Sequence, residues 1–478
     1  MKKDTLPSPF ISVIPLLALV ILLSCVISVF GSDALSGASQ VSLLFSTALS
    51  IGLSMIIYKT PWSDFENTIQ ENIKGTSVAL LILLIIGALS GSWMISGIVP
   101  TLIYYGIQII HPDYFLFTSC LICAVVSVMT GSSWTTIATI GVALLGIGKA
   151  LGFADGWIAG AIISGAYFGD KISPLSDTTV LASSAARTQL FTHIRYMMYT
   201  TIPSMLIALT VFLFAGFAQE GSGAQDIGAY LHGLDSTFKI SGWLMIVPIV
   251  TAYLIYKKIP SLITLFASVV MACIMAIIFQ PDLLVKIADT GETGAWAIFK
   301  GIFITMYGAT SLDTGLEALN DLVSTGGMSG MMDTIWLILC AMCFGGAMSA
   351  SRMLKSFLQA IFSKLMHTRF GLVLSTVLNG IFLNLATGDQ YVSIILTATM
   401  FREKYEEEGY ESRLLSRSCE DSATVVSVLI PWNTCGMTQA SVLGVATIVY
   451  LPFCFFNLIS PVMSCVYALF GWKIRRQK

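Results

Sequence analysis

The chain has 478 residues, of which 55% are hydrophobic and only 11% are charged, with a mean hydropathy of +0.83. A soluble globular protein carries about 25% charged residues, so this chain lacks the polar surface needed to face water on all sides. Its net charge of −2 says nothing about a nucleic-acid partner, but no basic tract in the sequence is long enough to bind one.

Apolar runs of membrane-spanning length recur along the whole sequence. They lie at residues 10–30, 41–58, 192–217, 243–256, 262–279 and 446–470. About 20 apolar residues in a helix match the hydrocarbon core, so these runs predict an all-α polytopic membrane protein with about 9 to 12 crossings. The first run follows Lys2 and Lys3, as in a signal peptide, but it exceeds a typical signal core of roughly 7–15 residues. We therefore expect it to be retained as a membrane helix.

The segment 114–147 is apolar on both sides of Thr130-Gly131-Ser132. Both of its ends are poor in positive charge, which is typical of the external side of a membrane. These features predict a re-entrant hairpin with its tip at the polar triplet. Because irregular backbone at membrane depth is tolerated only where it is buried in protein or lines a cavity, Thr130, Ser132 and Ser133 become candidate binding residues.

The next segment, 156–185, holds the densest polar cluster within an apolar region. Its members are Asp170, Lys171, Ser173, Ser176, Asp177 and Thr178, grouped around Pro174. A proline removes a backbone hydrogen bond, so we predict a discontinuous helix. A charge at the bilayer centre costs at least about 2.5 kcal/mol, and such residues are usually functional. A solvent loop between two spans is the alternative, but 156–185 is only long enough to cross once.

The chemistry of this cluster suits Na⁺. Carboxylates, hydroxyls and the backbone carbonyls freed by the proline supply the oxygens that a hard cation prefers, and the cluster has no His, Cys or Met for a transition metal. Asp170 and Asp177 are the expected sodium ligands here. Lys171, between them in sequence, is expected to partner one of these carboxylates when the ion is absent.

The middle of the chain predicts a linker and a connecting helix over 219–259. The loops 219–238 and 311–332 are acidic or poor in positive charge and are expected to be external. Whether 296–310 crosses the membrane stays open.

The second half of the sequence contains a similar polar triplet and a similar proline break. A hairpin over 371–402, with its tip at Thr387-Gly388-Asp389, precedes a second discontinuous helix over 418–446 that contains Pro431-Trp432-Asn433-Thr434. Thr387, Asn433 and Thr434 are candidate ion- or substrate-binding residues, and Asp389 is the third expected sodium ligand. Asp421, ten residues before Pro431, is expected to be a gate or mouth residue. Glu420 beside Arg417 is typical of an interfacial ion pair.

A shift of 257 residues aligns these features without a gap, and internal repeats are common in transporters. The pairs that coincide are Thr130-Gly131-Ser132 with Thr387-Gly388-Asp389, Pro174 with Pro431, Ser164 with Asp421, and Trp134 with Tyr391. The chain therefore divides into a first repeat half at 1–218, the linker, and a second half at 260–478.

The distribution of positive charge predicts how the two halves are oriented. Residues 85–170 contain only Lys149 among Lys and Arg, whereas the matching window 342–427 contains eight. Since positive residues mark cytoplasmic loops, the two halves are expected to be inverted, with their hairpins entering from opposite sides. Basic residues at both termini (Lys2, Lys3, Lys473, Arg475, Arg476 and Lys478) place both ends in the cytoplasm.

A channel and an intramembrane protease are two alternative classes of membrane protein to a transporter. A channel would use similar polar residues but has less need of two inverted hairpins closing one site. A protease would need a catalytic dyad, which Asp170 and Asp177 resemble, but the duplicated breaks favour transport. Cys120-x-x-Cys123 and Cys340-x-x-Cys343 lack further nearby Cys or His ligands and are typical of helix packing.

The string Gly169-Asp170-Lys171-x-Ser173-Pro174-Leu175-Ser176-Asp177-Thr178-Thr179 resembles the hallmark of the NhaC family of bacterial Na⁺/H⁺ antiporters. Gly91-Ser92-Trp93, Thr130-Gly131-Ser132-Ser133-Trp134 and Thr387-Gly388-Asp389-Gln390 are similar to it as well, and the likeness covers roughly residues 75–470. The wider superfamily places sodium and substrate between two re-entrant hairpins and two broken helices, and several members move like an elevator.

This resemblance implies a secondary transporter, without a catalytic residue or cofactor, that exchanges cytoplasmic Na⁺ for external H⁺ in the bacterial inner membrane by alternating access. Some NhaC relatives instead exchange organic acids, such as malate for lactate, with coupled ions. Ser132, Ser133, Asn433 and Thr434 could equally hold the carboxylate of an organic acid or amino acid. The expected partners are therefore Na⁺, H⁺, the lipid bilayer and an organic anion as the alternative substrate, with a homodimer as one open assembly.

Overall fold

The computed structural model describes residues 6–30, 37–218, 227–257, 259–289, 294–362 and 366–474. Within these ranges the chain is helical, and the one β-type pairing is an isolated bridge between Thr310 and Thr325. Part of the predicted loop 219–238 and several predicted cytoplasmic charges lie outside the described residues. These charges are Lys2, Lys3, Lys364, Arg475, Arg476 and Lys478.

The membrane-spanning prediction is confirmed. Nine of the described helices are long and apolar enough to cross a membrane, and the number rises to eleven if each of two sharply bent helix pairs counts as one crossing. The longer helices outside the hairpins and the discontinuous helices are α1 (Pro9–Phe30), α2 (Ala38–Tyr58), α3 (Trp62–Ile95), α10 (Leu190–Ala218), α13 (Ser261–Phe279), α17 (Met332–Ala350) and α24 (Phe455–Phe470).

Shorter helices connect these spans. They are α4 (Ile98–Ile109), α11 (Ile227–Thr237), α12 (Ile246–Tyr256), α14 (Pro281–Ala288), α15 (Ala295–Tyr307), α16 (Glu317–Val323), α18 (Met353–Phe362) and α23 (Thr447–Tyr450). The segment 296–310 that the sequence left open is α15, whose 13 residues span about 20 Å. That length is too short to cross a hydrocarbon core of about 30 Å. The predicted loops 219–238 and 311–332 carry α11 and α16.

The first predicted hairpin is present, with a longer second arm than expected. It consists of α5 (Phe115–Thr130), the tip Gly131-Ser132, and a second arm formed by α6 (Ser133–Thr136), the π-helical turn η3 (Ile137–Gly141) and α7 (Val142–Ala150). The arms run antiparallel, because the ring of Phe115 at the start of α5 lies 5.3 Å from that of Phe153, just past α7.

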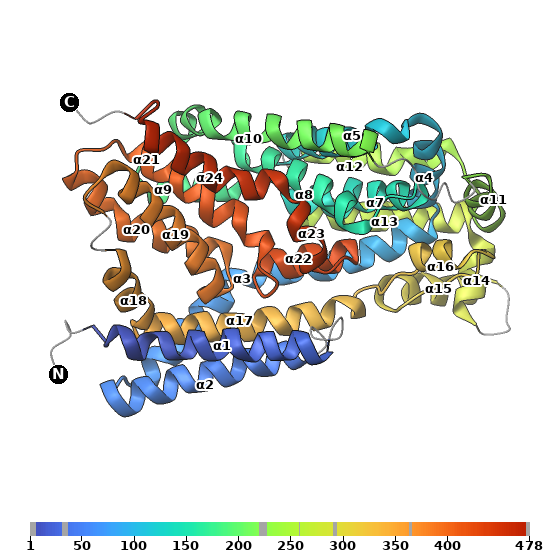
Figure 1. The fold of residues 1–478 in the computed structure, drawn as a ribbon. Coiled ribbons are helices and arrows are strands. Elements are labelled where there is room, and N and C mark those ends of the chain that lie inside the picture. Colours follow the sequence, from blue (N-terminus) through green and yellow to red (C-terminus); the bar gives the residue numbers. More distant parts are fainter. Residues whose placement is uncertain are drawn as a thin grey trace.

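The second hairpin is formed by α19 (Arg369–Thr387) and α20 (Gln390–Glu407), so it extends beyond the predicted end at 402. Its arms are joined by a hydrogen bond of 3.0 Å between the hydroxyls of Thr376 and Tyr405. The two hairpins lie at opposite ends of the molecule, with α19 and α20 at the left and α5 and α7 at the right of Figure 1. This arrangement agrees with an inverted repeat.

The two discontinuous helices are also confirmed. In the first half α8 (Asp155–Ile172) and α9 (Asp177–Ala185) flank a break at Pro174. In the second half α21 (Ser412–Cys419), the π-helical turn η6 (Glu420–Thr424) and the 3₁₀ turn η7 (Ser427–Leu429) precede a break at Pro431, and α22 (Thr434–Leu443) follows. This segment begins six residues before the predicted boundary at 418, because α21 already belongs to the same helical rod.

The hairpin tips repeat one hydrogen-bond pattern at the offset of 257 residues. The Thr130 hydroxyl accepts from the Ser132 amide at 3.1 Å, and the Thr387 hydroxyl accepts from the Asp389 amide at 3.3 Å. Gly131 and Gly388, with φ of 66° and 68°, supply the left-handed turn in each tip. The repeat inferred from sequence is therefore visible in backbone geometry.

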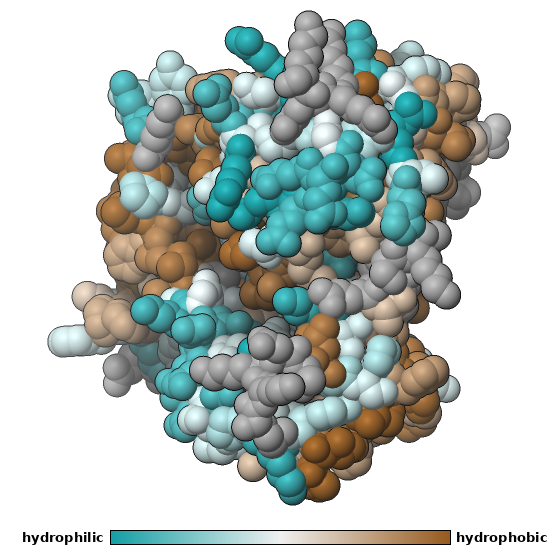
Figure 2. All heavy atoms as spheres, turned by 90° about the vertical axis from the view of Figure 1, so that its left-hand side faces the viewer, coloured by the Kyte–Doolittle hydropathy of each residue, from teal (hydrophilic) through white to brown (hydrophobic). Residues whose placement is uncertain are grey.

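The helices form two layers in the view of Figure 1. The hairpins, the discontinuous helices, α10 and α24 lie in the upper layer, and α1, α2 and α17 lie along the lower edge. The described chain begins and ends at the same, left-hand side. Seen from that side, hydrophilic residues gather in an upper and a lower group with hydrophobic residues between them (Figure 2).

Candidate functional site

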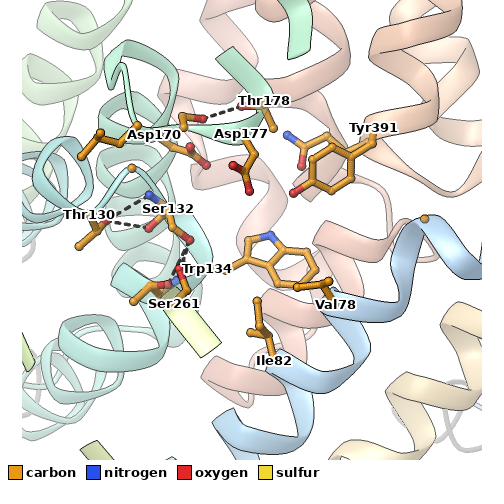
Figure 3. A pocket seen from close by; sticks show the side chains of 16 residues that line it. Val78, Ile82, Thr130, Ser132, Trp134, Asp170, Asp177, Thr178, Ser261 and Tyr391 are labelled. Atoms are coloured by element: carbon orange, nitrogen blue, oxygen red, sulfur yellow. Dashed lines mark hydrogen bonds between the residues drawn. The ribbon is translucent and has the colours of Figure 1, made fainter. Parts of the chain in front are cut away.

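A cavity of about 400 Å³ lies where the first hairpin, the first discontinuous helix, the second hairpin, α3 and α13 meet. Its lining residues are Gly75, Val78, Ile82, Thr130, Gly131, Ser132, Trp134, Thr135, Asp170, Leu175, Ser176, Asp177, Thr178, Ser261, Gln390 and Tyr391. In Figure 3 the carboxylates of Asp170 and Asp177 point into one space, with Ser132, Trp134 and Tyr391 around it.

Asp170 is held by the tip of the first hairpin. It lies near the end of α8, is 7% exposed, and accepts hydrogen bonds from the Ser133 amide at 3.1 Å and the Ser133 hydroxyl at 2.7 Å. Ser133 begins the second arm of the hairpin, where the first amides of a helix lack partners within the helix. The break between α5 and α6 thus supplies two donors to one carboxylate.

Asp177 is the first residue of α9, immediately after the break at Pro174. It is exposed and lines the cavity, unlike the buried Asp170. The reason is that the break turns the chain, so the start of α9 faces the open side of the cavity. Asp170 and Asp177 therefore offer one enclosed and one accessible carboxylate to the same space.

Hydroxyl groups complete this wall of the cavity. The Ser176 side chain caps α9 by accepting from the Thr179 amide and pairs with the Thr178 hydroxyl at 2.9 Å. Ser173, also predicted as a binding residue, does not line the cavity. It donates to the Val128 carbonyl at 2.9 Å and ties the break to the first hairpin.

The predicted residues of the second tip form a separate buried cluster. Asp389 caps α20 by accepting from the Val392 amide at 2.8 Å, and its second oxygen is buried without a hydrogen-bond partner among the residues that the structure describes. The Thr434 amide donates to the Gly388 carbonyl at 2.8 Å, and Asn433 binds Asn384 at 3.0 Å. None of Thr387, Asp389, Asn433 and Thr434 is among the described residues lining the cavity.

Lys171 does not partner Asp170 or Asp177. Its ammonium forms an ion pair with Asp421 and donates to the Ser460 hydroxyl at 2.8 Å, with both charged side chains fully buried. Thr200 also donates to Asp421, at 2.9 Å. Adjacent residues of a helix lie about 100° apart around its axis, so Asp170 faces the cavity while Lys171 faces the second half.

Asp421 is therefore not at the cytoplasmic mouth, since it is 0% exposed. The expected interfacial pair of Glu420 with Arg417 is not found among the described contacts either. Glu420 is fully buried and accepts from the Thr178 hydroxyl at 3.3 Å, directly behind the cavity wall, while Arg417 lies 3.9 Å from Asp421 and over the ring of Tyr196.

Sequence reasoning expected the second hairpin to contribute but did not select the residues through which it lines the cavity. Gln390 and Tyr391 follow Asp389 and line the cavity, although Asp389 itself does not. The signal was present, because Trp134 and Tyr391 coincide in the repeat and both prove to be lining residues. Gln390 also accepts from the Cys435 thiol at 2.8 Å, which connects the cavity to the second break.

The lining suits a hard cation. Its polar groups are carboxylates, hydroxyls, one side-chain amide, the indole N–H of Trp134 and backbone, and the described lining includes no His, Cys or Met. Nor do the described residues contain a group of three or more His, Cys, Asp or Glu side chains that could hold a metal ion.

Comparisons with known proteins agree with this chemistry. The model of the Na⁺/H⁺ antiporter family matches residues 5–186 and 165–472. The chain is 37% identical to the Na⁺/H⁺ antiporter NhaC of Alkalihalophilus pseudofirmus over 87% of each chain. It is 35% identical to the malate-2H⁺/Na⁺-lactate antiporter of Bacillus subtilis over 98% of this chain and 96% of that one. It is 33% identical to the arginine/ornithine antiporter ArcD of Halobacterium salinarum over 97% and 92%, respectively.

Proposed function

The chain belongs to the Na⁺/H⁺ antiporter family, and on this basis we propose that it exchanges cytoplasmic Na⁺ for external H⁺ at the cavity between its two hairpins. The observation that carries the proposal is the pair Asp170 and Asp177, which a broken helix directs into one cavity beside the hydroxyls of Thr130, Ser132 and Thr178. No enzymatic step or cofactor is part of the proposal.

Competition at the carboxylates would couple the two ions. A proton and Na⁺ both neutralise a carboxylate, so occupation by one removes the electrostatic attraction for the other. Exchange follows if the protein seldom changes between its inward-open and outward-open states while both carboxylates are empty and charged. The Lys171–Asp421 pair would keep its own charges balanced throughout, since it lies outside the cavity.

An elevator movement fits the walls of the cavity. One side is formed by Val78 and Ile82 of α3 and by Ser261 of α13, and the other by the hairpins and the discontinuous helix. We propose that the hairpins and discontinuous helices slide as a body past α3 and α13, because the cavity lies at the boundary between the two groups.

The proposed location is the bacterial inner membrane with both ends of the chain in the cytoplasm. The described chain begins and ends on one side of the molecule, where α18, α20 and α21 also lie (Figure 1). These helices carry Lys355, Arg402, Lys404 and Arg413, and an excess of Lys and Arg marks the cytoplasmic side.

A second candidate is a sodium- or proton-coupled exchanger of an organic acid or amino acid. Two observations favour it. The relatives include proteins named for malate and lactate and for arginine and ornithine. The cavity volume of about 400 Å³ also lies within the range of roughly 300–1,000 Å³ that small-molecule sites occupy.

The primary proposal is tested with the purified full chain in proteoliposomes that contain a pH-sensitive dye. Addition of NaCl to one side should move protons in the opposite direction, and Asp177→Asn and Asp170→Asn should each abolish this flux. Asp282→Asn, at an exposed residue of α14, is the matched control and should transport normally. Sodium-dependent proton flux in Asp177→Asn would overturn the proposed role of this carboxylate.

A further inference from the structure

The charge on the cavity wall has only one sign. Among the described residues lining it, Asp170 and Asp177 are the charged ones, and none is Lys, Arg or His. The nearest cation in sequence, Lys171, is turned away and already paired with Asp421. A ligand that enters the cavity therefore meets two carboxylates without a fixed cation to balance them.

Two aromatic side chains stand beside these carboxylates. Trp134 follows the tip of the first hairpin and Tyr391 follows the tip of the second, at positions related by the repeat. In Figure 3 both rings border the space into which Asp170 and Asp177 point. Aromatic faces attract cations and also cover alkyl carbons, so this pair has more to offer an organic cation than a bare metal ion.

The cavity is also larger than Na⁺ needs. A sodium ion with about six waters, at roughly 30 Å³ per water, would fill less than half of its volume of about 400 Å³. The remaining space, next to Val78, Ile82 and the two aromatic rings, has an apolar border. Such a border suits a short hydrocarbon chain better than additional water.

We infer that this cavity accepts an organic ammonium ion, with its charged nitrogens at Asp170 and Asp177 and its carbons against Trp134 and Tyr391. The inference rests on the proposed function, because the ammonium ion would occupy the same carboxylates as Na⁺ and compete with it. It narrows the second candidate function to amines and basic amino acids. Organic anions are disfavoured, since they would bring like charge to both carboxylates.

Three four-carbon probes of matched length test the inference: 1,4-diaminobutane, 1,4-butanediol and succinate. Each is added to wild-type proteoliposomes during Na⁺-driven proton flux. The diamine should raise the apparent KM for Na⁺ at least fivefold without lowering the maximal rate, whereas the diol and succinate should change it less than twofold. Stronger competition by succinate than by the diamine would overturn the inference.

Variants then test the aromatic pair. The quantity compared is the ratio of the inhibition constant of the diamine to the KM for Na⁺ of the same variant. Trp134→Leu and Tyr391→Leu should each raise this ratio by about three- to tenfold. Trp243→Leu, at an exposed tryptophan outside the cavity, is the control and should leave that ratio unchanged. An unchanged ratio in both cavity variants would exclude the aromatic contacts.

Different results would refute the proposed Na⁺/H⁺ exchange and the proposed ammonium site. If wild-type protein shows no Na⁺-driven proton flux, the proposed function is wrong, and thermal stabilisation of the detergent-purified protein by the diamine still tests the cavity. Stabilisation by the diamine that Asp177→Asn removes would support the ammonium site. If proton flux is normal but the diamine neither competes nor stabilises, only the inference is wrong.

Discussion

Lys171 of the first repeat half forms an ion pair with Asp421 of the second, although its neighbour Asp170 faces the cavity. Both paired side chains are fully buried. The pair thus joins the two discontinuous helices behind the cavity, while the cavity itself is formed in front of them. Helix α8 therefore contributes to two polar sites on different faces, the cavity through Asp170 and the buried ion pair through Lys171.

Removing one partner of this pair should be much more damaging than removing both. Asp421→Asn leaves a buried ammonium without its carboxylate, and breaking a buried pair in this way costs about 3–5 kcal/mol. We expect a large drop in the melting temperature of the purified protein in detergent. The double variant Lys171→Met/Asp421→Leu should recover the part of that loss that comes from the unpaired ammonium, while Arg417, which lies 3.9 Å from Asp421, still loses its carboxylate. A double variant no more stable than Asp421→Asn would show that the ion pair is not the cause.

Loss of the Ser133 hydroxyl should weaken sodium binding. The hydroxyl donates to Asp170 at 2.7 Å, and a hydrogen bond to a charged group contributes about 1.5–3 kcal/mol. Ser133→Ala should therefore raise the KM for Na⁺ about tenfold or more in the proteoliposome assay. Ser119→Ala is the matched control, because that buried hydroxyl in α5 has no hydrogen-bond partner within the described part of the chain. Equal effects of both variants would contradict the prediction.

The first hairpin tip should not tolerate a side chain at Gly131. A Cβ there would lie 2.6 Å from the Leu175 Cβ, and φ is +66°. Gly444 has a nearly identical φ of +64° but no heavy atom within 4 Å of an added Cβ. Gly444→Ala therefore measures the backbone strain alone, about 1–2 kcal/mol. Gly131→Ala should lower the melting temperature further and reduce transport, and equal melting temperatures would refute the packing argument.

The cavity should be reachable by water-soluble reagents from one side only. Leu175 lines it and is 36% exposed, whereas Ser173 two residues earlier is 0% exposed. In a background with the exposed Cys25 replaced by Ser, Leu175→Cys should react with a membrane-impermeant maleimide added to the cytoplasmic side. That side is expected because Ser261 of the cavity wall comes four residues after the basic Lys257, and positive residues mark the cytoplasmic side. Ser173→Cys should react far more slowly. Labelling of Leu175→Cys exclusively from the external side would reverse the proposed orientation.

The sequence predicted the breaks well because their causes are local. Pro174 and Pro431 cannot continue a helix, and Gly131 and Gly388 permit the left-handed turn that each tip requires. Apolar length likewise predicts which segments can cross, although helix ends such as Ser412 and Glu407 depend on packing and differed from the expected boundaries.

The grouping of the charged residues was harder to predict because it depends on which face of a helix each residue occupies. Asp170 and Lys171 are adjacent in sequence, yet one contacts Ser133 and the other Asp421, 250 positions away. Nothing in the local sequence favours that distant partner. Glu420 and Asp421 show the same divergence, since they contact Thr178 and Lys171, respectively.

The hydroxyls of Thr130 and Thr387 have a consequence for how fast the protein can work. Each closes its hairpin tip with hydrogen bonds inside the tip itself, so neither tip has to give up those bonds when it leaves a neighbouring helix. If the hairpins and discontinuous helices move as one body, the bonds from the tips to Asp170 and Thr434 also stay intact, so the movement is opposed mainly by friction with the surrounding lipid and by lost surface contacts. The transport rate should accordingly depend on the fluidity and thickness of the host membrane. A change in lipid composition would then change the rate without any change in the binding site.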